Sequence, residues 1–153
     1  MYRELIETFV QDNEWVKIQP PCPDNEIVAA EKAIGYSLTE DLKNLLKEMN
    51  GDKWLLWSAR EIAEKTKGIR EGFYALFEED FGMEAYKNRI ERFIFFAGNG
   101  CGDYYCYRVS EDGIADENAI YIWEHENIGE DCCWRKVADS LSECITRYYD
   151  SEI

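Results

Sequence analysis

The chain has 153 residues, of which 46% are hydrophobic and 14% aromatic, so it can bury a core and lacks the low hydrophobicity typical of disorder. It carries 17 basic and 32 acidic side chains, a formal net charge of −15, which argues against nucleic-acid binding because phosphate contacts need clustered Lys and Arg. No apolar run approaches the roughly 20 residues that cross a bilayer, and the opening MYRELIETFVQDNEW is too acidic for a signal peptide. We therefore expect one domain over 1–153, in the cytoplasm, with neither a nucleic-acid nor a membrane partner.

Two helices are predicted before residue 36. Apolar side chains recur at helical spacing in RELIETFV, and the prolines of IQPPCP end that helix. The next segment, DNEIVAAEKAIG, has acidic residues at its start and a glycine at its end. Asp24 or Asn25 is therefore the expected N-cap, and Gly35 the expected stop.

The segment SLTEDLKNLLKEMNG predicts a third helix. Thr39 is suited to cap it, two acidic residues follow at its positive end, and Gly51 is expected to end it. Its apolar stripe consists of Leu42, Leu45, Leu46 and Met49.

Residues 53–92 are less regular. KWLLW predicts a short strand, and Ser58 is suited to cap a helix after it. Aromatic and apolar residues continue the helical pattern beyond residue 71, but Gly72 and Gly82 are expected to interrupt it.

The last third of the chain predicts three strands and one helix. RFIFFA, DYYCYRV and AIYIWEHE are rich in aromatic and β-branched residues, and SEDGIADEN reads as the turn between the last two. A final helix, SLSECITRYY, is expected after WRKVAD with Asp139 as its cap. The order of elements predicts an α+β fold with N-terminal helices, a mainly antiparallel meander and a C-terminal helix, since βαβ units are missing.

Three glycines lie within five positions in FFAGNGCGDYYCYRV, residues 95–109. A phosphate-binding loop would lead from a strand into the N-terminus of a helix, whereas this loop leads into a second strand. Asp103 at its end would also repel phosphate. The pattern favours a wide hairpin turn in which the glycines and Asn99 adopt positive φ, and no nucleotide or other cofactor is expected.

Six cysteines and one histidine limit the other kinds of site. The cysteines form no CxxC pair, and with one histidine a zinc site would need three thiolates, so we expect reduced, metal-free thiols, with no metal site. His125 is expected at the end of a strand, packed beside Tyr121 and Trp123. An enzyme that uses a Cys–His125 pair remains an alternative, although the sequence selects none of the six thiols.

The five tryptophans are expected to lie mostly in the core, as large aromatic residues usually do. Near the end of an element, Trp57 or Trp134 is suited to rim a binding surface instead.

The acidity is concentrated toward the C-terminus. Residues 97–153 hold 4 basic and 13 acidic side chains, a net charge of −9. Such a charge favours attraction to a basic partner, and the alternative is that it only keeps the protein soluble.

Several segments together resemble the SUKH superfamily of fungal cell-wall-synthesis regulators and bacterial toxin-immunity proteins. AIGYSLTEDLKNLLKEMNG is similar to the family's opening motif, in which a glycine precedes a helix that ends in Asn-Gly; Thr39 stands where the family generally has proline. The matching positions are Gly35, Leu38, Asp41, Leu42, Leu45, Asn50 and Gly51.

The second half of the chain carries three further matches. FIFFAGNGCGDYYCYRV resembles the family's strand, glycine-rich turn and GD-x-Y strand, although Arg108 falls near a position where aspartate is common. IYIWEHE resembles the following strand, through Trp123 and His125. VADSLSECI resembles the terminal helix, so the resemblance extends from about residue 24 to 150.

The resemblance implies an α+β binding module with no shared catalytic apparatus. In bacteria it implies a cytoplasmic immunity protein that neutralises a cognate toxin, such as a nuclease with a basic cleft; a regulatory adaptor like the fungal branch is the alternative. The carboxylates expected to contact a basic toxin domain are Asp103, Glu111, Asp112, Asp116, Glu117, Glu124, Glu126, Glu130 and Asp131.

Overall fold

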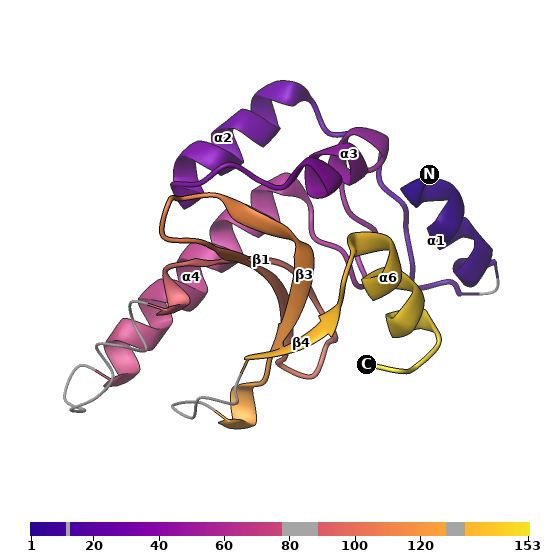
Figure 1. The fold of residues 1–153 in the computed structure, drawn as a ribbon. Helices are drawn as coiled ribbons and strands as arrows, with labels where there is room; N and C mark the ends of the chain where they lie inside the picture. Colours follow the sequence, from indigo (N-terminus) through magenta and orange to yellow (C-terminus); the bar gives the residue numbers. More distant parts are fainter. Residues whose placement is uncertain (12, 78–88, 128–133) are drawn as a thin grey trace.

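A computed structural model gives the fold of the chain (Figure 1) and describes residues 1–11, 13–77, 89–127 and 134–153. Within these ranges five α-helices accompany a four-stranded antiparallel sheet of order β1-β2-β3-β4. The helices are α1 (Tyr2–Val10), α2 (Asp24–Ile34), α3 (Glu40–Glu48), α4 (Ala59–Phe77) and α6 (Leu141–Tyr149). The strands are β1 (Phe93–Gly98), β2 (Tyr104–Val109), β3 (Ala115–Trp123) and β4 (Trp134–Ala138), with a 3₁₀ turn, η1 (His125–Asn127), after β3. The predicted α+β fold is confirmed.

The helix ends follow local capping chemistry, with two differences from prediction. Thr39 caps α3, because its side chain accepts a hydrogen bond from the N–H of Leu42 (3.2 Å), and Gly35 ends α2 in the left-handed conformation. The N-cap of α2 is Pro23 and not Asp24 or Asn25. The N-cap of α6 is Ser140 and not Asp139, since the hydroxyl of Ser140 accepts from the N–H of Glu143.

Helix α4 is longer than the glycine pattern predicted. Ser58 caps it as expected: its hydroxyl accepts from the N–H of Glu61 (3.2 Å), and the Glu61 carboxylate accepts from the N–H of Ser58 (2.8 Å). The helix continues through Gly72 to Phe77, so the expected interruption at Gly72 is wrong. Packing outweighs the small propensity cost of one glycine. Gly82 lies outside the described residues.

The predicted strand KWLLW forms only an isolated bridge, between Leu56 and Ala97. The Trp57 N–H donates to the carbonyl of Phe96 (3.1 Å), and the Gly98 N–H donates to the carbonyl of Leu55 (3.1 Å). These bonds use backbone groups on the outer side of β1, an edge strand that would otherwise expose them. The segment therefore shields the edge of the sheet without forming a strand of its own.

The sheet also contains a strand that the sequence pattern did not predict. WRKVA, to which no element was assigned from the sequence, forms β4 and pairs with β3. In addition, β3 begins at Ala115, so Asp116 and Glu117 lie on the strand and the turn is shorter than SEDGIADEN.

Aromatic side chains lie on both faces of the sheet, but they make different contacts on each. On one face the rings pack against one another: Phe93 stacks on Trp134 (centroids 4.6 Å apart) and Tyr104 on Trp123 (5.7 Å). On the other face Tyr105 lies against Tyr148 of α6.

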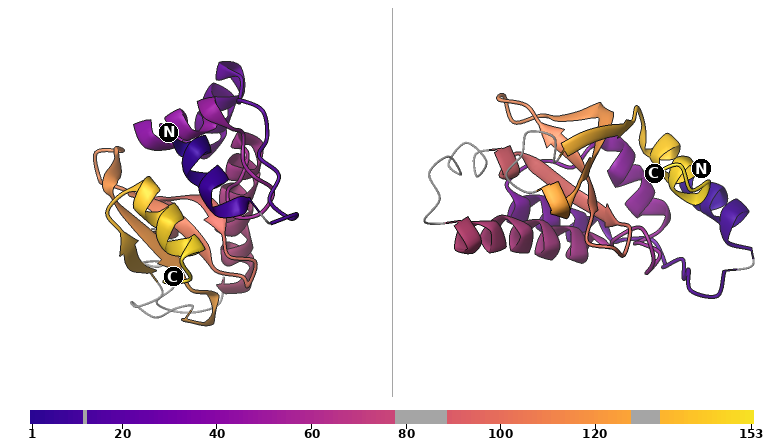
Figure 2. Two further views of the ribbon diagram at one scale, coloured as in Figure 1. Left: turned by 90° about the vertical axis from the view of Figure 1, so that its right-hand side faces the viewer. Right: turned by 90° about the horizontal axis from the view of Figure 1, so that it is seen from below.

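Helix α4 packs against β1, and α1 lies beside α6 (Figures 1 and 2). The buried apolar residues form one continuous core.

Two tryptophans depart from the expected core position. Trp57, Trp123 and Trp134 are buried, whereas Trp15 is 72% and Trp54 46% exposed. Trp57 and Trp134, the two tryptophans considered suited to the rim of a binding surface, are both buried.

Candidate functional site

The loop between β1 and β2 is built around the side chain of Asn99. Its Oδ1 accepts hydrogen bonds from the N–H groups of Cys101 (2.9 Å) and Asp103 (3.3 Å). These donors face Asn99 and not an open cradle, and the loop leads into β2 and not into a helix. Gly100 and Gly102 have positive φ (79° and 96°) as predicted, but Gly98, the last residue of β1, and Asn99 do not. The geometry is that of a hairpin turn.

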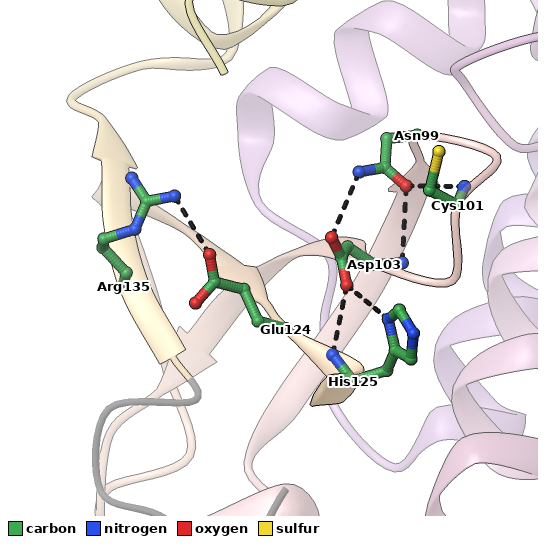
Figure 3. Close-up of polar contacts among 6 residues, drawn as sticks. All are labelled: Asn99, Cys101, Asp103, Glu124, His125 and Arg135. Carbon is green, nitrogen blue, oxygen red and sulfur yellow. Dashed lines mark hydrogen bonds and ion pairs between the residues drawn. The ribbon is translucent and has the colours of Figure 1, made fainter. Parts of the chain in front are cut away.

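Asp103 joins this loop to the turn that follows β3 (Figure 3). Its Oδ1 accepts from both the backbone N–H of His125 (3.1 Å) and the ring Nδ1 (2.7 Å), and its Oδ2 accepts from Nδ2 of Asn99 (3.3 Å). A carboxylate only accepts, so the Nδ1 of His125 carries a proton. A side chain at Gly102 would lie 3.1 Å from that ring, which explains the glycine before the aspartate.

The position of His125 differs from the predicted strand end. It lies in η1, with its imidazole 43% exposed, against Asp103. Burial raises the pKa of Asp103, but the hydrogen bonds from His125 and Asn99 outweigh burial and hold that pKa below its usual value. The Asp103–His125 hydrogen bonds therefore link the two ends of the chain segment 103–125.

None of the four cysteines in the described residues forms a nucleophilic pair with His125. Cys101 is exposed, but in Figure 3 its sulfur and the imidazole lie on opposite sides of Asp103. Burial raises the pKa of the Cys22 thiol to about 11 and that of Cys144 to about 12, which opposes formation of a thiolate. Cys106 is also buried, and Cys132 and Cys133 lie outside the described residues. In the described ranges, no three His, Cys, Asp or Glu side chains gather as a metal site would require.

The predicted acidic residues fall into two groups at opposite ends of β2. Tyr104, the first residue of β2, pairs with Trp123, and Val109, its last, pairs with Ala115. The turn after Val109 is therefore separated from Asp103 by the length of a six-residue strand, about 20 Å. Those predicted carboxylates that the structure describes therefore do not form one continuous surface.

The first group, near the β2–β3 turn, contains three exposed carboxylates: Glu111, Asp112 and Asp116. We call these three residues the turn group. Asp112 accepts from the hydroxyl of Ser110, and Asp116 from the N–H of Asn118 (2.9 Å). Glu117 is different, because its carboxylate accepts from the N–H of Glu40 at the start of α3. It therefore fills a position at the N-terminus of a helix.

The second group lies at the other end of the sheet and is mostly engaged within the chain. Asp103 holds His125, and Glu124 pairs with Arg135 (3.2 Å; Figure 3). Glu126 is exposed in η1. Glu130 and Asp131 lie outside the described residues.

The residues that follow α3 have a structural role that the sequence pattern did not assign. Asp52 is fully buried, and its Oδ1 accepts from the N–H groups of Trp54 (2.9 Å) and Leu56 (2.8 Å). The side chain of Asn50 accepts from the N–H of Ala59 (2.9 Å). A local pattern could have predicted this role, because Asn50 and Asp52 flank Gly51, and Asn and Asp side chains beside a glycine commonly accept hydrogen bonds from backbone N–H groups in a turn.

The architecture and these motifs agree with one known family. A model of the SMI1/KNR4 family (SUKH-1) matches residues 21–147. The chain belongs to this family. No curated protein matches the chain.

Several structural features lie at the positions that carried the SUKH resemblance. Thr39 caps α3 although the family generally has proline there, and Gly51 has a φ of +86° in a position where a side chain would meet backbone atoms. Asp103 of the GD motif holds His125. The SUKH family is generally non-catalytic. None of the helices in the described residues is long and apolar enough to span a membrane.

Proposed function

We propose that this SUKH protein is a non-catalytic binding protein that neutralises a cognate protein toxin with a basic surface, as an immunity protein does. The proposal rests on the family and on the charge of the chain. A net charge of −15 disfavours nucleic acid as the ligand and favours a basic protein.

The observation that carries the proposal is the state of the turn group. Glu111, Asp112 and Asp116 are exposed, and within the described residues none of them pairs with a Lys or Arg. In contrast, Asp103 and Glu124 are occupied by contacts inside the chain. Among the predicted carboxylates that the structure describes, the turn group is therefore the largest neighbouring set that is exposed and without a basic partner.

The chemistry of such a contact follows from electrostatics. A nuclease toxin needs a basic cleft for its nucleic acid, and carboxylates projecting from a turn can enter or cover that cleft. An acidic field raises association rates by about 10- to 1,000-fold and weakens as salt is added. The contact requires no catalytic group on this chain.

The test uses the protein encoded by the reading frame next to this gene. Coexpression should protect cells from that protein, and the triple change Glu111→Lys, Asp112→Lys and Asp116→Lys should remove the protection. Glu117 is left unchanged because it contacts α3. A matched control reverses the exposed Glu4, Glu64 and Glu71, which changes the net charge equally but elsewhere on the molecule.

The result decides between this function and the regulatory alternative. Protection by the parent and the control, with none by the turn-group variant, supports neutralisation through this turn. If the neighbouring protein is harmless and unbound, the chain is instead an adaptor like the fungal branch of the family. Equal protection by all three proteins would mean that the turn group does not form the contact.

A further inference from the structure

The two exposed tryptophans are held outward by the same local device. Trp15 follows Asn13 in the sequence NEW, and Trp54 follows Asp52 in DKW. Oδ1 of Asn13 accepts from the N–H of Trp15 (3.0 Å), and Oδ1 of Asp52 accepts from the N–H of Trp54 (2.9 Å). Each is an Asx turn, which fixes the backbone next to the indole.

The turn at Trp54 also holds a residue in an unfavourable conformation. Lys53 has a φ of +58°, which is uncommon for a residue other than glycine. Backbone strain of this kind persists only where the surroundings impose it. Here the surroundings include the buried carboxylate of Asp52, which accepts from the N–H of Trp54, and the indole that follows is 46% exposed.

The two turns lie next to each other in the fold. The N–H of Lys17 donates to the carbonyl of Asp52 (2.8 Å), and the N–H of Gln19 donates to the carbonyl of Gly51 (3.0 Å). These bonds join the segment that follows Trp15 to the segment that precedes Trp54. The two indoles therefore project from adjoining stretches of backbone.

Further aromatic rings lie at the ends of α1 and α6, and one of them reaches Asp52, which precedes Trp54 by two residues. Phe9 of α1 stacks on Tyr149 of α6 (centroids 5.2 Å apart), and Tyr149 meets Tyr148 edge to face (5.2 Å). The Tyr149 hydroxyl donates to Oδ2 of Asp52 (3.4 Å). We call these residues the aromatic band: Phe9, Trp15, Trp54, Tyr148 and Tyr149.

Three members of the aromatic band, Phe9, Tyr148 and Tyr149, belong to α1 and α6, which stand side by side in the left view of Figure 2. The two tryptophans lie in the segments that follow α1 and α3. Beside the band is a surface hollow of about 660 Å³ lined by residues that include Phe9, Glu14 and Trp15. Tyr148 packs against Tyr105 near the start of β2, so the band and the turn group lie at opposite ends of that strand. The band is a second surface, distinct from the turn group.

We infer that the aromatic band is a docking surface for a basic protein segment, whose arginine side chains stack on the indoles of Trp15 and Trp54. The chain already uses this chemistry: Lys65 lies 4.5 Å from the ring centroid of Trp57, and Arg89 lies 5.1 Å from that of Trp134. Across the described residues no Lys or Arg covers the two exposed indoles.

The net negative charge of the chain favours a basic protein segment over a second copy of the chain as the partner of the aromatic band. The chain carries a net charge of −15, although the exposed charges nearest the band in sequence are of both signs: Glu14 and Asp150 are acidic, and Lys17 and Lys53 are basic. A second copy of the chain would bring two like net charges together, whereas an arginine-bearing segment is attracted. Guanidinium groups also stack on aromatic faces better than other cations do.

A titration with a defined peptide tests the inference. The probe is an eight-residue peptide of alternating arginine and glycine, added to ¹⁵N-labelled protein in 0.15 M NaCl while the indole N–H signals are followed by NMR. The signals of Trp15 and Trp54, assigned from Trp15→Ala and Trp54→Ala, should shift. Those of the buried Trp57, Trp123 and Trp134 should not.

The double variant Trp15→Ala/Trp54→Ala should bind the peptide about 5- to 30-fold more weakly, as expected for the loss of two exposed cation–π contacts. The control Val28→Ala/Ile114→Ala removes two other exposed apolar side chains and should bind like the wild type. Changing the three turn-group carboxylates to lysine should leave the peptide-induced shifts of the Trp15 and Trp54 signals unchanged. Loss of toxin protection would then test the proposed function, and loss of these shifts would test the present inference.

Two results would overturn the inference: binding by the double tryptophan variant within twofold of the wild type, or no shift of either exposed indole on saturation with peptide. Should the double variant not fold, the indole shifts of the wild-type protein decide alone.

Discussion

Asp52 shows how one buried carboxylate organises the backbone beside it. Burial raises its pKa, and hydrogen bonds from backbone N–H groups only partly oppose that effect. A raised pKa means that stability falls as pH rises from the unfolded value, near 3.8, through the folded value. At neutral pH the ionised side chain therefore costs stability while its oxygens satisfy the turn.

This balance predicts different results for two substitutions. Asp52→Asn keeps an acceptor for the N–H groups of Trp54 and Leu56 without the buried charge, so urea unfolding at pH 7 should show stability equal to or above the wild type. Asp52→Ala leaves buried donors unpaired and should lose about 1–3 kcal/mol. If Asp52→Asn is as damaging as Asp52→Ala, the charge itself is required.

Asp103 should show the opposite pH dependence. Because its pKa is lowered in the folded chain, the stability it contributes is present above the unfolded value near 3.8 and is lost as pH falls through the folded value. Asp103→Asn places an amide donor toward Nδ2 of Asn99 and should cost about 1–2 kcal/mol at pH 7. Urea unfolding of both proteins should show that difference shrinking below pH 3.8; a constant difference would contradict the account.

At the scale of elements, two glycines provide a matched comparison. Gly51 and Gly100 both have positive φ, but a Cβ at Gly51 would lie 2.8 Å from the backbone N of Ser58, whereas a Cβ at Gly100 meets nothing within 4 Å. Gly100→Ala should therefore cost about 1–2 kcal/mol, the conformational cost alone. Gly51→Ala should cost about 2–5 kcal/mol, because overpacking is added to strain.

Thermal or urea unfolding of the two variants checks this prediction. Equal losses would mean that the close approach between the end of α3 and the start of α4 can relax. The comparison is informative because both substitutions change the same residue type to alanine at a similar backbone conformation.

The elements that the sequence predicted well are those with local signals. Thr39, Ser58 and Gly35 stand at helix ends where short-range hydrogen bonds and conformation decide the boundary. Strand β4 lacked such a signal. Arg135 and Lys136 are adjacent exposed residues, so strict alternation fails in a short strand whose pairing with β3 shifts register between Lys136 and Ala138. Only pairing with β3 identifies this segment as a strand.

The sequence was enough to select the acidic residues of the candidate site, but not to predict where the fold places them. Acidity and the GD motif are visible in the sequence, yet the division of the carboxylates depends on where β3 begins and on which partners they meet. Asp103 and Glu117 are occupied by contacts with residues 22 and 77 positions away. The exposure of Trp15 and Trp54 likewise depends on tertiary packing, although the Asx residues that hold them are visible locally.

For the whole molecule, the charge of −15 and its placement are the central feature. If this charge acts in recognition, association with the proposed basic partner should be fast and sensitive to salt, while dissociation should depend on close contacts. The turn group and the aromatic band lie at opposite ends of β2, so changes in charge and changes in aromatic contact can be made independently.

The most direct test measures the association rate constant of the purified chain with the protein of the neighbouring reading frame at 0.05 and 0.5 M NaCl. We predict that the rate falls at least tenfold with salt, and that reversing Glu111, Asp112 and Asp116 lowers the low-salt rate at least tenfold, while the Glu4, Glu64 and Glu71 control lowers it less. A turn-group variant that associates at the parent's rate at both salt concentrations, with an unchanged melting curve, would contradict the account.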